Sequence, residues 1–265
     1  MILVAIKNYS RPGGIVVRVN QWIKQREGDR NRFLWYGMAG YLIFLFLVVM
    51  IRAAITGITF DEAYTYLHFG QIDLLDLRKV AKLFARKDSL ANNHWLNSIL
   101  INLTVNATGV EYSEFLIRLP SLIFLAMYLT GVVWGYRRKY YSLPTLVFLV
   151  SNYYLLEFYG LARGYGMAHT FVFFSCCFFC EWKRSDYLEH RYVNRLMILM
   201  SLATFSNTIV LLIYPAFGLV CLLRLIQHKQ FGSFFRKNLL EILIFILFTM
   251  LMVFYGVRVI RPFPV

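Results

Sequence analysis

Apolar runs about as long as a membrane span recur along this 265-residue chain, and they constrain its fold more than any other feature. The clearest runs cover residues 33–51, 115–134, 143–160, 164–181 and 239–257. A bilayer core requires about 20 apolar residues per helix, so each run matches one span. With 59% hydrophobic residues and a mean hydropathy of +0.56, the chain is too apolar for a soluble domain of this length. The sequence therefore predicts an all-α polytopic membrane protein.

Basic residues are concentrated in short clusters between the apolar runs. Lys and Arg number 28 against 14 Asp and Glu, and the formal net charge of +14 would by itself suit nucleic acid. Basic clusters that flank spans are instead typical of topology signals, so we expect no nucleic-acid partner. Residues 1–32 hold seven cations without the apolar region of a cleavable signal peptide. We predict a basic cytoplasmic arm there.

The positive-inside rule places the N-terminus in the cytoplasm and residues 53–114 on the extracytoplasmic side. Residues 92–108 are rich in Asn, and an interfacial helix there keeps the basic triplet at 137–139 inside. The apolar stretch at 196–223 holds 28 residues, between the lengths of one span and two, and a single span would place the basic residues at 224–237 outside. A pair of short helices that breaks near Ser206-Asn207 is therefore predicted, and it would leave a hollow on the extracytoplasmic side.

The predicted architecture is one transmembrane module over residues 33–257 with about seven membrane helices. In its first extracytoplasmic loop, residues 60–88 mix apolar and charged positions, as amphipathic helices on a membrane surface do. Residues 258–265 follow as a short extracytoplasmic tail. We expect a multi-pass protein of the cell inner (plasma) membrane, in contact with membrane lipids and with its functional site on the extracytoplasmic face.

Two adjacent carboxylates, Asp61 and Glu62, follow the first span by about ten residues. Charged groups beside a span are unfavourable near hydrocarbon and are often functional when they face a cavity. Neighbours on a helix point about 100° apart, so one carboxylate suits a base while the other orients a substrate or a helix. The competing interpretation is that both cap the N-terminus of an amphipathic helix, where carboxylates are favoured.

Two arginines and a histidine are expected on the same side as these carboxylates. Arg118 and Arg163 lie near the extracytoplasmic ends of their spans, where cations oppose the positive-inside trend and need a partner. A phosphate is one candidate, because a planar guanidinium matches its oxygens. A structural ion pair with a nearby carboxylate, Asp61 and Glu62 among them, is the other. His94 suits a hydrogen-bonded interfacial residue as well as a functional one.

Neither a metal nor another cofactor is predicted. No cluster with metal-ligand spacing accompanies His94, which leaves a divalent metal weakly supported. The four cysteines lie inside apolar runs, where thiols pack as small hydrophobic groups. Gly164 and Gly166 flank Tyr165 and would let a backbone or a ligand approach closely. Carboxylates and arginines at membrane level fit attack of a hydroxyl on a phosphate-linked lipid donor.

Four motifs in order resemble the C-type (GT-C) membrane glycosyltransferases, the superfamily of protein O-mannosyltransferases and lipid A aminoarabinose transferases. The matching segments are Phe60-Asp-Glu-Ala-Tyr64, Asn92-Asn-His-Trp-Leu-Asn97, Arg118-Leu-Pro-Ser121 and Ala162-Arg-Gly-Tyr-Gly166. The resemblance covers residues 33–225 and implies the family's transmembrane module. It also implies transfer of a sugar, with inversion, from a polyprenyl-phosphate donor to an acceptor on the outer face.

By similarity, Asp61 is the general base and Glu62 positions the acceptor or a loop. The arginine motifs place Arg118 and Arg163 near the donor phosphate, and His94 and Tyr165 belong to the same substrate-binding region. The family's His-Pro-Pro-type motif is here His-Trp-Leu, without prolines.

Many relatives continue beyond the point where this chain ends, with further spans and a soluble domain. We therefore expect a minimal enzyme, a truncated product, or one half of a two-chain enzyme. In the last case a protein partner supplies recognition of the acceptor, be it a glycan, a lipid or a protein. Two other functions stay open at this point. One is a non-catalytic lipid-binding or assembly subunit derived from the same fold, and the other is a transporter of a phosphorylated lipid.

Overall fold

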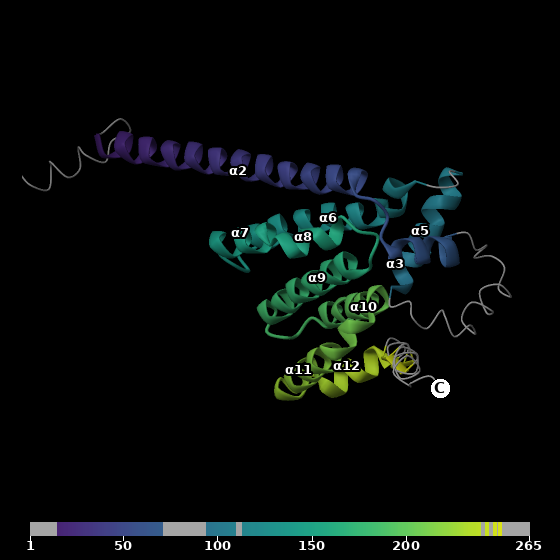
Figure 1. Ribbon diagram of the computed structural model, residues 1–265. Helices are drawn as coiled ribbons and strands as arrows, with labels where there is room; N and C mark the ends of the chain where they lie inside the picture. The colour runs from purple at the N-terminus through teal and green to yellow at the C-terminus, as the bar shows by residue number, and fades with distance from the viewer. Residues whose placement is uncertain are drawn as a thin grey trace, which may run out of the picture. The chain divides into compact units, whose positions relative to one another are not determined.

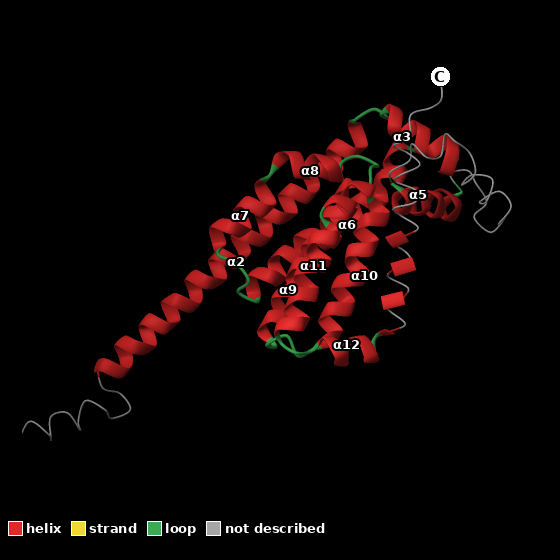
Figure 2. Ribbon diagram, turned by 90° about the horizontal axis from the view of Figure 1, so that it is seen from below, coloured by secondary structure: helices red, strands yellow, loops and turns green. Residues whose placement is uncertain are grey.

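A computed structural model shows that the described regular elements of the chain are all helices (Figures 1 and 2). It describes residues 15–70, 94–109 and 113–239 and six further positions between 242 and 250. The prediction of an all-α chain is confirmed for these residues. Much of the predicted arm, the greater part of the predicted surface helices at 60–88, and the predicted tail lie outside the described residues.

The chain divides into two compact units, residues 1–47 and residues 48–265. The described part of the first unit belongs to a single helix, α2 (Ile15–Ile55), whose last residues belong to the second unit. Its segment Arg32–Ile55 has a mean hydropathy of 2.3 and is long enough to cross a membrane.

In the second unit, helix α6 (Glu114–Arg137) is also long and apolar enough to cross a membrane, with a mean hydropathy of 1.9. The helix begins where the Ser113 hydroxyl accepts a hydrogen bond from the Leu116 amide at 3.3 Å. By length and composition, this helix and the apolar segment of α2 are the two candidate spans among the described residues. The finer prediction of about seven membrane helices is not tested by these two candidates and stays a prediction.

The run predicted as one span at 143–160 is divided into helices α7 (Leu143–Ser151) and α8 (Tyr153–Tyr159). Asn152 separates them with an extended backbone, and its side-chain oxygen accepts a hydrogen bond from the Leu155 amide at 3.2 Å. An Asn in this position satisfies an amide that the helix start leaves without a partner. The prediction of one continuous helix is wrong here, because hydropathy does not register a cap inside an apolar run.

Helices α9 (Tyr165–Arg184) and α10 (His190–Ser206) lie side by side and supply most of an apolar core of 14 buried residues (Figure 1). Helix α11 (Tyr214–Gln227) and the short helix α12 (Phe231–Lys237) complete it. The core contains, among others, Met167, Phe171, Trp182, Leu196, Met200 and Leu225. Helix α9 occupies the run predicted as a span at 164–181.

The predicted break near Ser206-Asn207 is confirmed. Helix α10 ends at Ser206, and a 3-10 helix, η3 (Thr208–Leu212), leads into α11. Asn207 has an extended backbone, and its Oδ1 accepts a hydrogen bond from the Ile209 amide at 3.0 Å. The side chain thus caps the new turn locally.

Three elements cover the start of α6: helix α3 (Phe60–Thr65), the π-helical turn η1 (Tyr66–Gly70) and helix α5 (Trp95–Thr108). A small buried cluster of Tyr66, Ile101, Ile117 and Ala162 joins η1 and α5 to α6 and to the turn before α9. The Asn102 amide donates to the Phe69 and Gly70 carbonyls at 2.8 and 3.1 Å, which ties α5 to η1. The predicted helix at 92–108 is therefore present from residue 95.

Contacts between loops gather the basic helix ends at one end of the second unit. The Arg184 guanidinium donates to the Arg138 carbonyl, so the C-terminal ends of α6 and α9 lie together. The Tyr187 ring lies 4.4 Å from the His228 ring, which adds the end of α11. The starts of α3, α6 and α9 and the end of α10 lie at the opposite end, where the contacts described below are made.

We predict that Gly164→Ala destabilises the protein, because a Cβ at this position would lie 1.8 Å from the Ser206 carbonyl oxygen. The obstacle is backbone, which shifts less readily than a side chain, and overpacking of this kind costs about 1–3 kcal/mol. The measurement is the thermal unfolding midpoint in detergent. Gly40→Ala is the control, since no atom lies within 4 Å of a Cβ there. Equal midpoints for the two variants would contradict the contact.

Candidate functional site

The structure brings the predicted site residues together at one end of the second unit, through a chain of contacts. The residues are Asp61, Glu62, His94, Arg118, Arg163 and Tyr165. They form a fully buried ion pair and an outer group around a second, more exposed ion pair. The two groups meet at the turn that precedes α9.

Glu62 and Arg118 form the buried pair, and the side chains of both are fully inaccessible to solvent. Arg118 Nε donates to Glu62 Oε1 at 2.9 Å and Nη2 donates to Oε2 at 2.7 Å. This two-pronged geometry is the strong form of an arginine–carboxylate contact. A buried pair is stable only when its other polar groups also have partners.

The remaining Arg118 donors bind backbone carbonyls at the end of α2. Nη1 reaches the carbonyls of Ala53 and Thr56 at 2.8 and 2.5 Å, and Nη2 reaches the Gly57 carbonyl at 3.0 Å. All five N–H groups of the guanidinium thus have acceptors. The structure therefore favours the ion-pair alternative for Arg118 over the predicted contact with a donor phosphate.

Glu62 also fixes the start of α3 and the turn before α9. Its Oε2 accepts from the Thr59 amide at 2.8 Å while the Thr59 hydroxyl accepts from the Glu62 amide at 3.4 Å, a reciprocal capping box. Its Oε1 accepts from the Ala162 amide at 2.6 Å. The helix-capping interpretation therefore applies to Glu62, and its position suits the predicted role in holding a loop.

These contacts decide the charge of Glu62. Burial raises the pKa of the carboxyl, but hydrogen bonds from Arg118, Ala162 and Thr59, together with the Arg118 charge, outweigh burial and lower the pKa below 4.5. Glu62 is therefore ionised at neutral pH and accepts hydrogen bonds with both oxygens. A group held in this way is poorly suited to take up a proton.

Asp61 is the exposed member of the acidic pair. Its side chain is 56% exposed, and its Oδ2 lies 3.0 Å from Arg163 Nη2. Since adjacent helical residues point about 100° apart, anchoring Glu62 inward directs Asp61 outward. The two carboxylates thus have different environments, as expected if one orients and the other reacts.

Arg163 is bound incompletely by the described part of the chain. Its Nε is buried and has no hydrogen-bond partner among the described residues. The turn that carries it is fixed on both sides, because the Asn97 amide donates to the Ala162 carbonyl at 2.7 Å and Gly164 lies against Ser206. A buried donor without a partner is costly, so water or a ligand is expected to satisfy it.

His94 and Tyr165 lie beside this turn, with ring centroids 4.9 Å apart in an edge-to-face arrangement. His94 Nδ1 lies 3.3 Å from the Ser206 carbonyl, which can only accept, so the proton is on Nδ1. Burial lowers the pKa of His94 and the Arg163 charge lowers it further, whereas the hydrogen bond to the Ser206 carbonyl and the Asp61 charge raise it. The net shift is downward, and the imidazole is neutral at pH 7.

Sequence reasoning missed two structural features of this site. The spacing of Thr59 and Glu62 is the S/T-x-x-E signature of a capping box, which could have assigned Glu62 to the helix start. Asn97 belongs to the same motif as His94, and only His94 was predicted as a site residue. The Asn97 side chain nevertheless binds the turn at Ala162. No pattern in the sequence indicates that partner.

Side chains that can bind a metal do not cluster in the described residues. These residues contain no group of three or more His, Cys, Asp or Glu side chains placed to hold a metal ion. The four cysteines are unpaired with one another, and Cys177 and Cys221 are buried in the core as small apolar groups. The arrangement of Asp61 and Arg163 instead suits proton uptake beside a developing negative charge.

Comparison with protein-family models, with curated protein sequences and with solved structures found no match for this chain.

We predict that Glu62→Gln lowers the free energy of unfolding by about 3–5 kcal/mol, because it leaves the buried Arg118 charge without its partner. Glu157→Gln is the matched control. Glu157 pairs with Arg52 at 2.6 Å, but the two side chains are 26% and 43% exposed, and such pairs contribute about 0–1 kcal/mol. Denaturant or thermal unfolding in detergent measures both. Equal losses would contradict the anchoring role of the Glu62–Arg118 pair.

We also predict that stability depends on Glu62 at acid pH. Its folded pKa lies below the unfolded value of 4.5, so the unfolded chain binds more protons between the two values. The contribution is therefore complete above pH 4.5 and is lost as the pH falls through the folded pKa. The unfolding midpoint of the wild type should fall more steeply below pH 4.5 than that of Glu62→Gln. Parallel profiles for the two proteins would exclude this linkage.

Proposed function

We propose that the chain is a membrane glycosyltransferase that uses a polyprenyl-phosphate-linked sugar and an acceptor hydroxyl on the extracytoplasmic face. The observation that carries the proposal is the Asp61–Arg163 pair, an accessible carboxylate 3.0 Å from a guanidinium. Both groups sit on backbone fixed by the buried Glu62–Arg118 pair. The motif resemblance supplies the substrate class.

In the proposed reaction, the acceptor hydroxyl attacks the anomeric carbon of the donor sugar. Its proton passes to the Asp61 carboxylate as the new carbon–oxygen bond forms. The bond from the anomeric carbon to the phosphate oxygen breaks, and its electron pair stays on the polyprenyl phosphate. Attack opposite the leaving group inverts the anomeric configuration. Arg163 stabilises the charge on the departing phosphate.

The contacts divide these roles between the charged residues. Glu62 accepts four hydrogen bonds and is inaccessible, so we assign it to positioning. Of the two arginines predicted to bind the donor phosphate, we keep Arg163 alone, because its buried Nε has no partner among the described residues. Neutral His94 and Tyr165 stand beside Arg163 as candidate contacts to the substrate.

The distribution of apolar and charged residues supports a membrane location with this site outside. Large apolar side chains are exposed on α7 and α11, as lipid-facing positions require; examples are Phe148, Leu219, Leu223 and Ile226. The basic loops at 137–139 and 183–184 meet at the end opposite the site. The positive-inside rule then assigns that end to the cytoplasm. We keep about seven membrane helices, in a GT-C-like module of the inner membrane, as part of the proposal.

One observation favours a second candidate function. Arg163 already neutralises Asp61, so the pair would also serve a non-catalytic lipid-binding or assembly subunit as a structural link. Polyprenyl phosphate would then bind without any transfer.

We predict that Asp61→Asn folds and binds polyprenyl phosphate but transfers sugar about 10²–10⁴-fold more slowly, the usual loss for a general base. Asp186→Asn makes the same chemical change at an exposed position of the opposite end and should transfer normally. The measurement is release of polyprenyl phosphate from a panel of polyprenyl-phosphate sugars in membranes that contain the purified protein. Binding is measured with polyprenyl phosphate alone.

Two outcomes would count against the proposal. Normal transfer by a folded Asp61→Asn protein would remove Asp61 as the base. Binding of polyprenyl phosphate by the wild type, with no release from any sugar in the panel, would favour the subunit function.

A further inference from the structure

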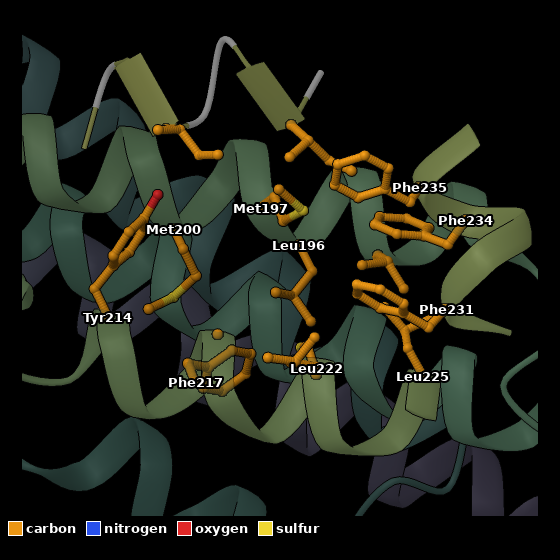
Figure 3. A pocket seen from close by; sticks show the side chains of 15 residues that line it. Leu196, Met197, Met200, Tyr214, Phe217, Leu222, Leu225, Phe231, Phe234 and Phe235 are labelled. Carbon is orange, nitrogen blue, oxygen red and sulfur yellow. The ribbon is translucent and has the colours of Figure 1, made fainter. Parts of the chain in front are cut away.

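A second site of a different chemical kind lies away from Asp61, between α10, α11 and α12. It is a cavity of about 210 Å³ whose described lining is almost entirely apolar. Figure 3 shows side chains from the three helices directed into it, including Leu196, Met200, Phe217, Leu222, Phe231 and Phe235. A cavity with this lining favours hydrocarbon over any polar ligand.

The hydroxyl at the Tyr214 end of the cavity already has hydrogen-bond partners within the protein. Tyr214 has the one hydroxyl among the described lining residues, and it lies 3.2 Å from the Ser201 hydroxyl and 3.1 Å from that of Thr249. The cavity follows α11 from Tyr214 to Leu225, a distance of about 16 Å at 1.5 Å per residue. Its dimension along the helix therefore suits an extended chain.

The other end of the cavity is cationic. Residues 189–241 contain six Lys and Arg against two Glu, and Glu189 pairs with Arg191 at 2.5 Å. Four of these cations lie close in sequence to the lining residues Leu225, Phe231 and Phe235; they are Arg224, Lys229, Arg236 and Lys237. The Arg224 guanidinium is held 5.5 Å above the Tyr187 ring, at the end that carries the basic loops.

An apolar channel with cations at one end matches a hydrocarbon tail that carries an anionic head group. A second copy of the chain is disfavoured, because it brings a like net charge of +14. A partner helix is about 10 Å wide and does not fit 210 Å³. Polyprenyl phosphate is assigned above to the opposite end of the unit, next to Arg163.

We propose that this cavity binds one acyl chain of an anionic glycerophospholipid, whose phosphate lies against Arg236, Lys237 and their basic neighbours. Such head groups attract basic residues beside a membrane, and each cation contributes about a fivefold gain in affinity. The proposal rests on the membrane location proposed above. It does not depend on glycosyl transfer or on Asp61.

The test uses the full chain in vesicles that contain phosphatidylglycerol with a photoactivatable group on its acyl chain. We expect labelling of α10, α11 and α12, and about a tenfold weaker signal from the phosphatidylcholine analogue. Gly218 lines the cavity, and a Cβ added there would have no atom within 4 Å, so the backbone accepts a side chain and we expect Gly218→Phe to occupy the cavity. We expect this variant to lose the labelling.

Matched variants separate filling of the cavity from general effects. Gly232→Phe makes the same change on α12, also with no atom within 4 Å, but outside the lining, and should keep the labelling. Arg236→Gln with Lys237→Gln should weaken labelling by phosphatidylglycerol alone, whereas Arg137→Gln with Lys183→Gln, at other helix ends, should not. All four cations are exposed, so neither double variant threatens the fold.

Three results would overturn the proposal. Equal labelling by the two phospholipids would remove the head-group contact. Undiminished labelling of Gly218→Phe would place the lipid elsewhere. Labelling of the same helices by a polyprenyl-phosphate probe, with none by phosphatidylglycerol, would assign the cavity to the donor. Loss of transfer in Asp61→Asn is independent of all three, so failure of this site and failure of the proposed activity are distinguishable.

Discussion

The buried contact between Glu62 and Arg118 holds together the end of the second unit that carries the candidate site. Two opposite charges without access to solvent are tolerated only because backbone groups complete their hydrogen bonds. Those groups come from the end of α2, the start of α3 and the turn before α9. A single ion pair therefore sets the relative positions of segments that are up to about a hundred residues apart in the chain.

The second constraint on this end is the close approach of backbone to backbone at Gly164. The absence of a side chain there lets the turn before α9 lie against the last residue of α10, and His94 contacts the same carbonyl. Arg163 is thus carried by a turn that is fixed on one side by Glu62 and Asn97 and on the other by Ser206. Its guanidinium extends from a rigid base, which is the arrangement that a site for a charged group requires.

The sequence was a good guide to which residues gather and a poor guide to how they pair. Periodic apolar runs and the charge rule assign helix ends to one side or the other, and this brings Asp61, Arg118 and Arg163 to the same end. Which charged residues pair depends on how each helix is rotated about its axis and how deeply it is buried. The charge pattern of the sequence carries no information about either. Both arginines were consistent with a phosphate or a carboxylate partner, and the burial of Arg118 distinguishes them.

The helix boundaries likewise include one that the sequence predicted and one that only the structure reveals. The break at Asn207 was predictable because the length of its apolar stretch lies between one span and two, and a single span would place the basic residues at 224–237 outside. The break at Asn152 lies inside an apolar run of ordinary span length, so only the cap that Asn152 forms reveals it. Length and hydropathy predict where helices are needed, whereas local hydrogen bonds determine where they end.

Neighbouring positions in α3 have different roles in the structure: Glu62 is buried and anchors three segments, whereas Asp61 is exposed and paired with Arg163. Glu62 cannot change without disturbing three segments, whereas Asp61 reaches Arg163 from the surface of the same helix. A chain with another residue at 61 would keep the same scaffold and present a different group in the same place. One substitution at position 61 could therefore change the chemical group that this surface presents. Glu62 at the next position would keep the helix and the neighbouring turn in place.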